Sequence, residues 1–332
     1  MTMRLVQIAN ASFGRRVAMV DGSSLRLLGT HRSIYSFALA AIETGCGLEE
    51  LILSDVSDLS LDYDEIYALG SGWSFLPAFD HPEEPSRCLV SGTGLTHLAS
   101  AANRDAMHAA STITDSMRMY RLGVERGRPA PGETGAAPEW FYKGTGAILR
   151  GHGAALTVPH FAGDGGEEPE LAAVYVIDAQ GTPCRVGMTT ANEFSDHQIE
   201  RQNYLYLAHS KLRPCAIGPE LVVHPDFSLV TGTVTIERGG STLWAKEIST
   251  GDQQMCHSLS NIEHHHFKYE SHRRPGDAHV HFLGAGAFSF GDGITLEEGD
   301  EMVIEWNGYG RPLRNRIEID KSEPEAVRVA AL

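Results

Sequence analysis

Short apolar runs separated by turn residues fill the chain from residue 86 onward, and they constrain its fold more than any other feature. Runs such as CLVSG, LAAVYVI, LVTGTVTIER and EMVIEW are bounded by Gly, Asp and Pro, as strands commonly are. A few stretches, around residues 97–120 and 196–210, favour helices instead. The pattern predicts a mostly-β fold of the α+β class with a mixed sheet, rather than a doubly wound fold.

The N-terminal quarter has a different pattern. Residues 4–30 read as short strands, and residues 31–52 place apolar side chains at helical spacing before Gly45 and Gly47. A proline-rich, acidic stretch follows at 76–87. We therefore expect a small N-terminal domain at 1–85 and a larger domain at 86–332. Within the larger domain, residues 121–140 read as a long loop without regular structure.

Composition restricts the possible partners. The chain has 332 residues and a formal net charge of −16, which disfavours nucleic acid and anionic membranes as partners. No apolar run approaches the length that spans a bilayer, and the N-terminus lacks a secretory pattern. The five cysteines show no CxxC spacing, and no glycine-rich nucleotide motif follows a strand. We expect a soluble, cytoplasmic protein without a nucleotide cofactor.

Three glutamates crowd into four positions directly before an apolar strand, in the sequence EEPELAAVYV at 167–176. Glu168 and Glu170 are two residues apart, so a strand would point both side chains to one face. Carboxylates held close together repel one another unless a cation neutralises them, and Mg²⁺ and Ca²⁺ prefer oxygen ligands. The residues alone permit two interpretations: a solvated strand end, or a site for a divalent cation.

Histidines form two other groups. The run EHHHF at 263–267 cannot direct three adjacent side chains at one ion, so we interpret these histidines as surface or loop residues. His279 and His281 share one face of an expected strand and are weaker candidates for substrate contact.

Four motifs follow one another in a telling order: FYKGTGAI at 141–148, EPELAAVYVID at 168–178, TANEFSDHQIE at 190–200 and HSKLRPCAIGPELVV at 209–223. This succession resembles the fumarylacetoacetate hydrolase superfamily, which shows a Phe-x-Lys segment, an E-x-E-L strand, an Asn-Asp-x-Ser helix start and a Gly-Lys-Ser…Gly-Pro loop. The similarity covers most of the chain. It implies a small leading domain and a catalytic domain built as a mixed β-sandwich or roll.

The resemblance implies a metal site. Glu168, Glu170 and Glu193 occupy the positions of the family's ligands for Mg²⁺, with Mn²⁺ or Ca²⁺ as other possibilities. Glu193 departs from the family, which has aspartate there. It is either a retained ligand or a charge that favours a helix N-terminus. We interpret Glu167 as a solvated neighbour.

The resemblance also implies catalytic and binding residues. Lys143 and Lys211 match the family's lysines, and a lysine beside a metal can act as a general base because its pKa is lowered. His97 is a candidate acid, with a hydrogen-bonded core histidine as the alternative. The candidate substrate contacts are Tyr204, Thr96 and Glu200, although Tyr204 can equally be a core or interface aromatic.

Departures from the family's pattern indicate which reaction to expect. Members that hydrolyse carbon–carbon bonds carry a His-x-x-Glu pair, but here His97 stands in a tyrosine position and Ser100 in the histidine position. The family's Gly-Thr is also replaced, by LGAGAFSF at 283–290. Without the pair, activation of water for hydrolysis is disfavoured.

We therefore expect a metal-dependent hydro-lyase of pentose catabolism, homodimeric by resemblance. It would dehydrate a small anionic keto acid, a 2-keto-3-deoxypentonate, to 2-oxoglutarate semialdehyde. One alternative is a hydrolase of a 2,4-diketo acid that activates water through His97 or His108. Another is a sugar-acid sensor without catalysis.

Overall fold

The structure, a computed structural model, describes residues 2–99, 101, 102, 114–323 and 325–332. Within these residues the strands form one sheet of 12 strands and one of five. Most neighbouring strands are antiparallel, but β15 pairs with β6, β12 with β8 and β17 with β9 in parallel. The prediction of a mostly-β fold with mixed sheets is confirmed.

The large sheet runs through both the N-terminal and the central parts of the chain. Its main strand order is β4-β3-β2-β1-β12-β11-β10-β15-β6-β7, with β5 beside β1 and β8 beside β12. The strands are β1 (Arg4–Asn10), β2 (Gly14–Asp21), β3 (Ser24–Leu28), β4 (Val56–Asp62), β5 (Trp73–Phe75), β6 (Cys88–Gly94), β7 (Glu139–Thr145), β8 (Leu149–Arg150), β10 (Pro169–Ile177), β11 (Pro183–Asn192), β12 (Cys215–Val222) and β15 (Ala278–Phe282).

Strand β10 lies in the middle of this sheet and is buried along its whole length. Ala172 and Val174 point into a core that α1 (Ile34–Thr44) also enters through Phe37. Leu171 and Ala173 point into a second core, on the opposite face. Because both faces are covered, the strand reads as a continuous apolar run instead of an alternating one.

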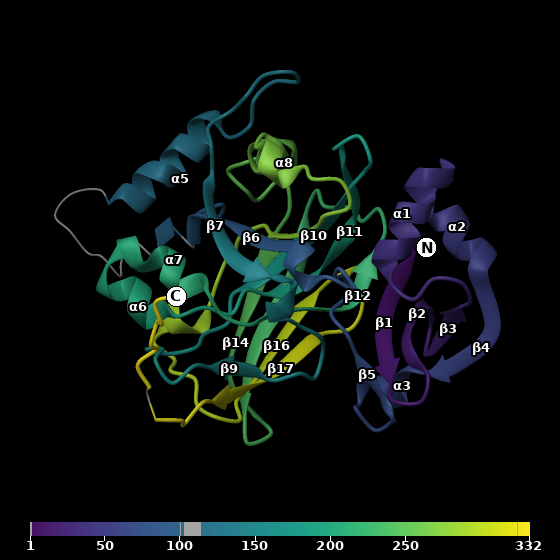
Figure 1. Cartoon of the computed structure of the whole chain (residues 1–332). Coiled ribbons are helices and arrows are strands. Elements are labelled where there is room, and N and C mark those ends of the chain that lie inside the picture. Colours follow the sequence, from purple (N-terminus) through teal and green to yellow (C-terminus); the bar gives the residue numbers. More distant parts are fainter. Residues whose placement is uncertain (1, 100, 103–113, 324) are drawn as a thin grey trace.

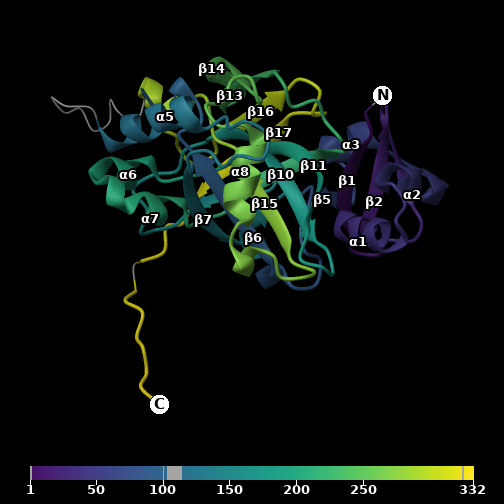
Figure 2. The same cartoon turned by 90° about the horizontal axis from the view of Figure 1, so that it is seen from above.

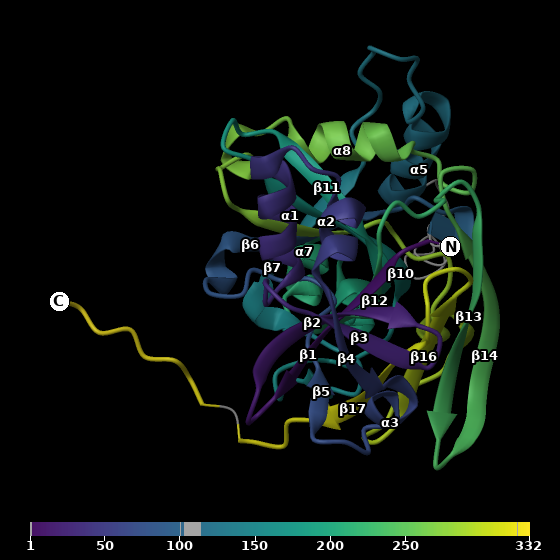
Figure 3. The same ribbon diagram turned by 90° about the vertical axis from the view of Figure 1, so that its right-hand side faces the viewer.

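The smaller sheet covers that second face. Its order is β14-β13-β16-β17-β9, and Figure 3 shows β13 and β14 at one side of the molecule. Val234 and Trp306 of this sheet join the same core as Leu171. The strands are β9 (Leu156–Val158), β13 (Val230–Arg238), β14 (Ser241–Thr250), β16 (Glu301–Trp306) and β17 (Leu313–Ile319).

The N-terminal unit lies beside the rest of the molecule (Figures 1 and 2). It contains β1 to β5 with α1, α2 (Leu48–Asp55) and α3 (Tyr63–Tyr67). Helix α1 begins after Ser33, whose side chain accepts a bond from the Ser36 amide, and ends at Gly45, whose φ of 69° favours glycine. Strand β1 pairs antiparallel with β12 and so joins this unit to the central strands. The domain boundary at residue 85 stays a prediction.

The remaining helices lie on the larger unit (Figure 1). They are α5 (Asp115–Arg126), α6 (His197–Gln202), α7 (Leu207–Lys211) and α8 (Leu259–Phe267). Helices α6 and α7 agree with the helical stretch expected at 196–210. The loop expected at 121–140 is wrong at its start, because α5 continues to Arg126 after its Thr114 cap. No helix in the described ranges is long and apolar enough to cross a membrane.

The interpretation of the histidine run as surface residues is wrong for His265 and His266, which α8 buries. His266 accepts a hydrogen bond from Trp140 at 3.1 Å, so its other nitrogen donates to His279 at 3.0 Å. His281 lies between the hydroxyls of β6, 2.9 Å from Ser91 and 2.7 Å from Thr93. These imidazoles form a polar layer between α8 and the large sheet.

Candidate active site

Three buried glutamates meet where β10 and β11 pair. The register places Pro169 opposite Asn192, so the glutamates that flank these residues become neighbours. The Glu193 amide also donates a hydrogen bond of 3.0 Å to the Glu168 carbonyl. One carboxylate oxygen from each of Glu168, Glu170 and Glu193 lies within 4.8 Å of the others. The structure thus brings the three predicted ligands together.

The three carboxylates of the triad have pKa values shifted in different directions. Burial, followed by the charges of Glu193 and Glu168, raises the pKa of Glu170 well above its usual range. Burial and Glu168 likewise raise the pKa of Glu193, against the pull of the lysines. Burial also opposes ionisation of Glu168, but Lys211 and His197 outweigh it and hold the pKa of Glu168 well below its usual range.

A divalent cation fits this set of donors. Carboxylate oxygens are the ligands that Mg²⁺, Mn²⁺ and Ca²⁺ prefer, and a cation among them would relieve the mutual repulsion. Glu170 is further oriented by the Gly284 amide, which donates to its Oε2 at 2.7 Å. The triad is the one group of three or more metal-ligating side chains found among the described residues.

The two predicted lysines both reach the triad. Lys143 Nζ donates to Glu193 Oε1 at 3.0 Å and to the Phe194 carbonyl at 2.8 Å. Lys211 Nζ donates to Glu168 Oε1 at 2.6 Å and to Glu193 Oε2 at 3.1 Å. Both side chains are almost completely buried. A solvated surface role is therefore excluded for either lysine.

Lys211 also lies over an aromatic ring of β7, the strand that carries one member of a second polar pair. Its ammonium lies 4.9 Å from the ring centroid of Phe141, on the face of β7 that also carries Glu139 and Lys143. Glu139 Oε1 accepts a short hydrogen bond of 2.5 Å from the Tyr204 hydroxyl. Tyr204 thus has a buried carboxylate partner, Glu139, that was not among the residues predicted from the sequence.

The signal for Glu139 was present in the sequence. Glu139, Phe141 and Lys143 alternate along β7 and so share one face of the strand. Neighbouring β6 makes room for this row, since a Cβ on Gly94 would lie 1.8 Å from Glu139 Oε2. A glycine opposite a buried carboxylate indicates a packed site rather than a flexible turn.

His97 and Thr96 border the triad through Gly284. The Thr96 hydroxyl donates to the Leu283 carbonyl at 3.0 Å and therefore accepts from His97 Nδ1 at 2.9 Å. His97 Nε2 lies 3.0 Å from the Thr250 hydroxyl, so both ring nitrogens have protein partners. Burial lowers the pKa of His97 to about 4, which makes the ring neutral at pH 7.

Four further residues singled out from the sequence have different outcomes. Glu200 is buried in α6. The interpretation of Glu167 as solvated is wrong: it is fully buried and accepts bonds from the Ser289 amide at 2.6 Å and the Ser289 hydroxyl at 2.8 Å. Ser100 and His108 lie outside the described residues.

Comparison of the sequence with known proteins finds no matching family model. The chain is 34% identical over 119 residues to 2-dehydro-3-deoxy-D-arabinonate dehydratase of Saccharolobus solfataricus, over 34% of this chain and 38% of that protein. It is 29% identical over 178 residues to a probable 2-keto-3-deoxyxylonate dehydratase of Haloferax volcanii, over 52% of this chain and 58% of that protein. The matched parts thus span less than two thirds of either relative.

Solved structures match over almost the whole chain. A 2-keto-3-deoxy-D-arabinonate dehydratase complexed with magnesium and 2,5-dioxopentanoate superposes with a TM-score of 0.70 at 20% identity, over 96% of this chain and all of the other. A 2-hydroxyhepta-2,4-diene-1,7-dioate isomerase from Mycobacterium marinum gives 0.58 at 17% identity, over 97% of this chain and all of the other. The chain thus shares the fold of these enzymes, and its sequence matches are to proteins named as sugar-acid dehydratases, in agreement with the resemblance noted from the motifs.

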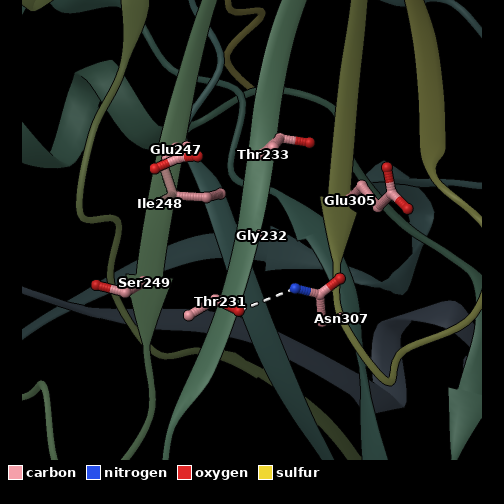
Figure 4. Close-up of a pocket in the computed structure, with 8 residues that line it drawn as sticks. All are labelled: Thr231, Gly232, Thr233, Glu247, Ile248, Ser249, Glu305 and Asn307. Carbon is pink, nitrogen blue, oxygen red and sulfur yellow. Dashed lines mark hydrogen bonds between the residues drawn. The ribbon is translucent and has the colours of Figure 1, made fainter.

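A hollow elsewhere does not suit a small anionic substrate. It has a volume of about 620 Å³ and lies on β13, β14 and β16 (Figure 4). Its lining includes the carboxylates of Glu247 and Glu305 and, among the described residues, no lysine or arginine. Carboxylates without a neighbouring cation repel a keto acid, whereas the buried triad has two lysines in contact with it.

Proposed function

We propose that this protein is a metal-dependent hydro-lyase that dehydrates a 2-keto-3-deoxypentonate to 2-oxoglutarate semialdehyde. The observation that carries the proposal is the buried triad of carboxylates with two lysines in direct contact. Both curated relatives carry the names of sugar-acid dehydratases, which supports this reading. Further support comes from the structure solved with magnesium and 2,5-dioxopentanoate, a synonym of the proposed product.

Glu168, Glu170 and Glu193 would hold the cation, with Mg²⁺ as the proposed metal and Mn²⁺ or Ca²⁺ as substitutes. When bound, a divalent cation stabilises negative charge on a keto oxygen as a Lewis acid. All other steps are assigned to side chains of the protein.

Lys211 is the proposed base that removes a proton from C3 of the substrate. It contacts Glu168 and Glu193 and also lies over Phe141, which shares one face of β7 with Glu139, the partner of Tyr204. The C3–H electrons pass into the C2–C3 bond as an enolate forms. Lys143, fixed between Glu193 and the Phe194 carbonyl, is the second candidate base and a source of positive charge for the substrate carboxylate.

The pair of Tyr204 and Glu139 is the proposed source of the proton for the leaving group. As the enolate collapses, the C4–O bond breaks and the hydroxyl leaves as water. The enone that remains isomerises to the semialdehyde. His97 is the second candidate for this acid, and Thr96 and Glu200 stay proposed substrate contacts.

The deciding experiment is product analysis. Purified protein with Mg²⁺ and 2-keto-3-deoxypentonate should form a semialdehyde, detected by NMR and by oxidation with an added aldehyde dehydrogenase. The Glu170→Gln variant is the matched control, because its amide preserves shape and removes the ligand charge. Accumulation of pyruvate would support a carbon–carbon hydrolase instead. Bound Mg²⁺ without turnover on a panel of keto acids would support a sensor.

Assembly and location complete the proposal. By resemblance to the superfamily we propose a homodimer that works in the cytoplasm. Light scattering coupled to size-exclusion chromatography measures the oligomeric state directly, and a mass close to 36.1 kDa, that of one chain, would refute the dimer.

A further inference from the structure

His197, the first residue of α6, has its ring stacked against two phenylalanines. The ring stacks on Phe288 with a centroid distance of 4.9 Å and an interplanar angle of 9°. It stacks on Phe290 at 5.1 Å and 28°. His197 is 2% exposed. Two stacked neighbours and nearly complete burial leave the imidazole little freedom to turn out of its plane.

This plane directs one ring nitrogen at a member of the triad. His197 Nε2 lies 3.1 Å from Glu168 Oε1. An ionised carboxylate only accepts hydrogen bonds, so the imidazole is the donor. The other nitrogen, Nδ1, is buried and has no hydrogen-bond partner among the described residues. Glu168 is therefore the side-chain hydrogen-bond partner of His197 within the described ranges.

We propose that His197 is a positioning residue that fixes the Glu168 carboxylate for cation binding, and that Phe288 and Phe290 fix His197 in turn. The inference rests on the proposed metal site. It also assigns a positioning role to the segment LGAGAFSF at 283–290, which departs from the superfamily's pattern and contains both phenylalanines. Ser289, between the two phenylalanines, binds Glu167 through its amide and hydroxyl, so the same segment holds both residues that begin the glutamate run.

Two substitutions separate positioning from packing. His197→Phe keeps an aromatic ring against Phe288 and Phe290 but removes the donor to Glu168. His197→Gln loses the stacking but can place an amide N–H near the position of Nε2. If His197 served only to fill space, the phenylalanine variant would bind Mg²⁺ normally and the glutamine variant would be the defective one.

Mg²⁺ affinity, measured by isothermal titration calorimetry on the full chain, is the primary readout, with the thermal midpoint as a check on folding. We expect His197→Phe to weaken Mg²⁺ binding by about 10- to 100-fold, as is typical when an outer partner of a metal ligand is removed. We expect the Mg²⁺ affinity of His197→Gln to be closer to that of the parent than the affinity of His197→Phe is, although the thermal midpoint of His197→Gln should be lower than the parent's. His209→Gln, an exposed histidine of α7, is the matched control and should bind like the parent.

The outcomes are distinguishable. Unchanged Mg²⁺ affinity in folded His197→Phe overturns the positioning role, while the metal site stands. Absence of Mg²⁺ binding by the parent overturns the proposed metal site itself. If His197→Phe does not fold, Phe288→Leu frees the ring but keeps the donor. Weakened Mg²⁺ binding by that variant then supports the inference, and parental affinity overturns it.

Discussion

Lys211 Nζ lies 2.6 Å from Glu168 Oε1 and joins α7 to the start of β10 by an ion pair that is buried on both sides. Replacement of Lys211 by methionine leaves buried carboxylates without this cation. We expect the free energy of unfolding, from urea titration without metal, to fall by about 3–5 kcal/mol, as is typical for a broken buried pair. Mg²⁺ should restore part of this loss but not activity. Unaltered stability of the variant would contradict the ion-pair geometry.

Glu170→Gln should uncouple metal binding from folding. The amide removes one of three mutually repelling carboxylates, whose repulsion and burial raise the pKa of Glu170. It can still accept the Gly284 amide bond. We expect the thermal midpoint without metal to equal or exceed that of the parent. Mg²⁺ should raise the parent's midpoint, since a ligand of the folded state stabilises it, and should leave the variant's unchanged. An equal shift in both proteins would refute Glu170 as a ligand.

Tyr204→Phe tests the proposed proton donor. The substitution removes the hydroxyl that donates to Glu139 but keeps the ring. We expect kcat to fall by about 100-fold or more, the usual range for loss of a general acid, with little change in Mg²⁺ affinity. Tyr206→Phe is the matched control, because Tyr206 lies two residues away in the same 3₁₀ turn and is half-exposed. Equal kcat values for the two variants would argue against the role of Tyr204.

Buried neutral histidines should make stability fall in mild acid. Burial lowers the pKa of His97 and His152 to about 4, and that of His279 and His281 to about 3. Between these values and the ordinary pKa of about 6.5, the unfolded chain binds protons that the folded chain does not. The neutral histidines therefore make their full contribution to the free energy of unfolding above pH 6.5. That contribution decreases as the pH falls below 6.5. His197 has the opposite effect on stability as the pH falls. Burial alone would lower the pKa of His197, but Glu168 outweighs burial and raises it.

Urea titrations at pH 7, 6 and 5 measure this slope. Each histidine that is protonated only on unfolding contributes about 1.4 kcal/mol per pH unit below pH 6.5. His279→Gln should make the slope shallower by roughly that amount per pH unit. Stability that stays constant or rises between pH 6.5 and 5 would contradict the neutral histidine layer.

The convergence of the triad and the lysines could be predicted because its determinants are local. Glu168 and Glu193 stand at the ends of two strands that follow one another, and antiparallel pairing of such strands brings their ends together. The motif order supplied the remaining members. The mostly-β class was similarly visible, since Gly, Asp and Pro mark most strand ends in the sequence itself.

What the sequence concealed depends on partners far away along the chain. Glu167 looks solvated until Ser289, more than a hundred residues later, covers it with two donors. His266 looks exposed within a run of three histidines, but Trp140 and His279 give its two nitrogens partners inside the protein. The burial of a polar residue can be predicted only when its hydrogen-bond partner is known, because buried polar groups are paired.

The pairing of β1 with β12 has a consequence for how this chain can be divided. Strand β12 is buried along its length, and β1 pairs with its last residues, Leu221 and Val222, on the side opposite β11. A protein cut back to the larger unit would expose this part of β12 as an edge and a template for neighbouring molecules. By pairing with β12, the N-terminal unit therefore protects this strand from edge-to-edge aggregation.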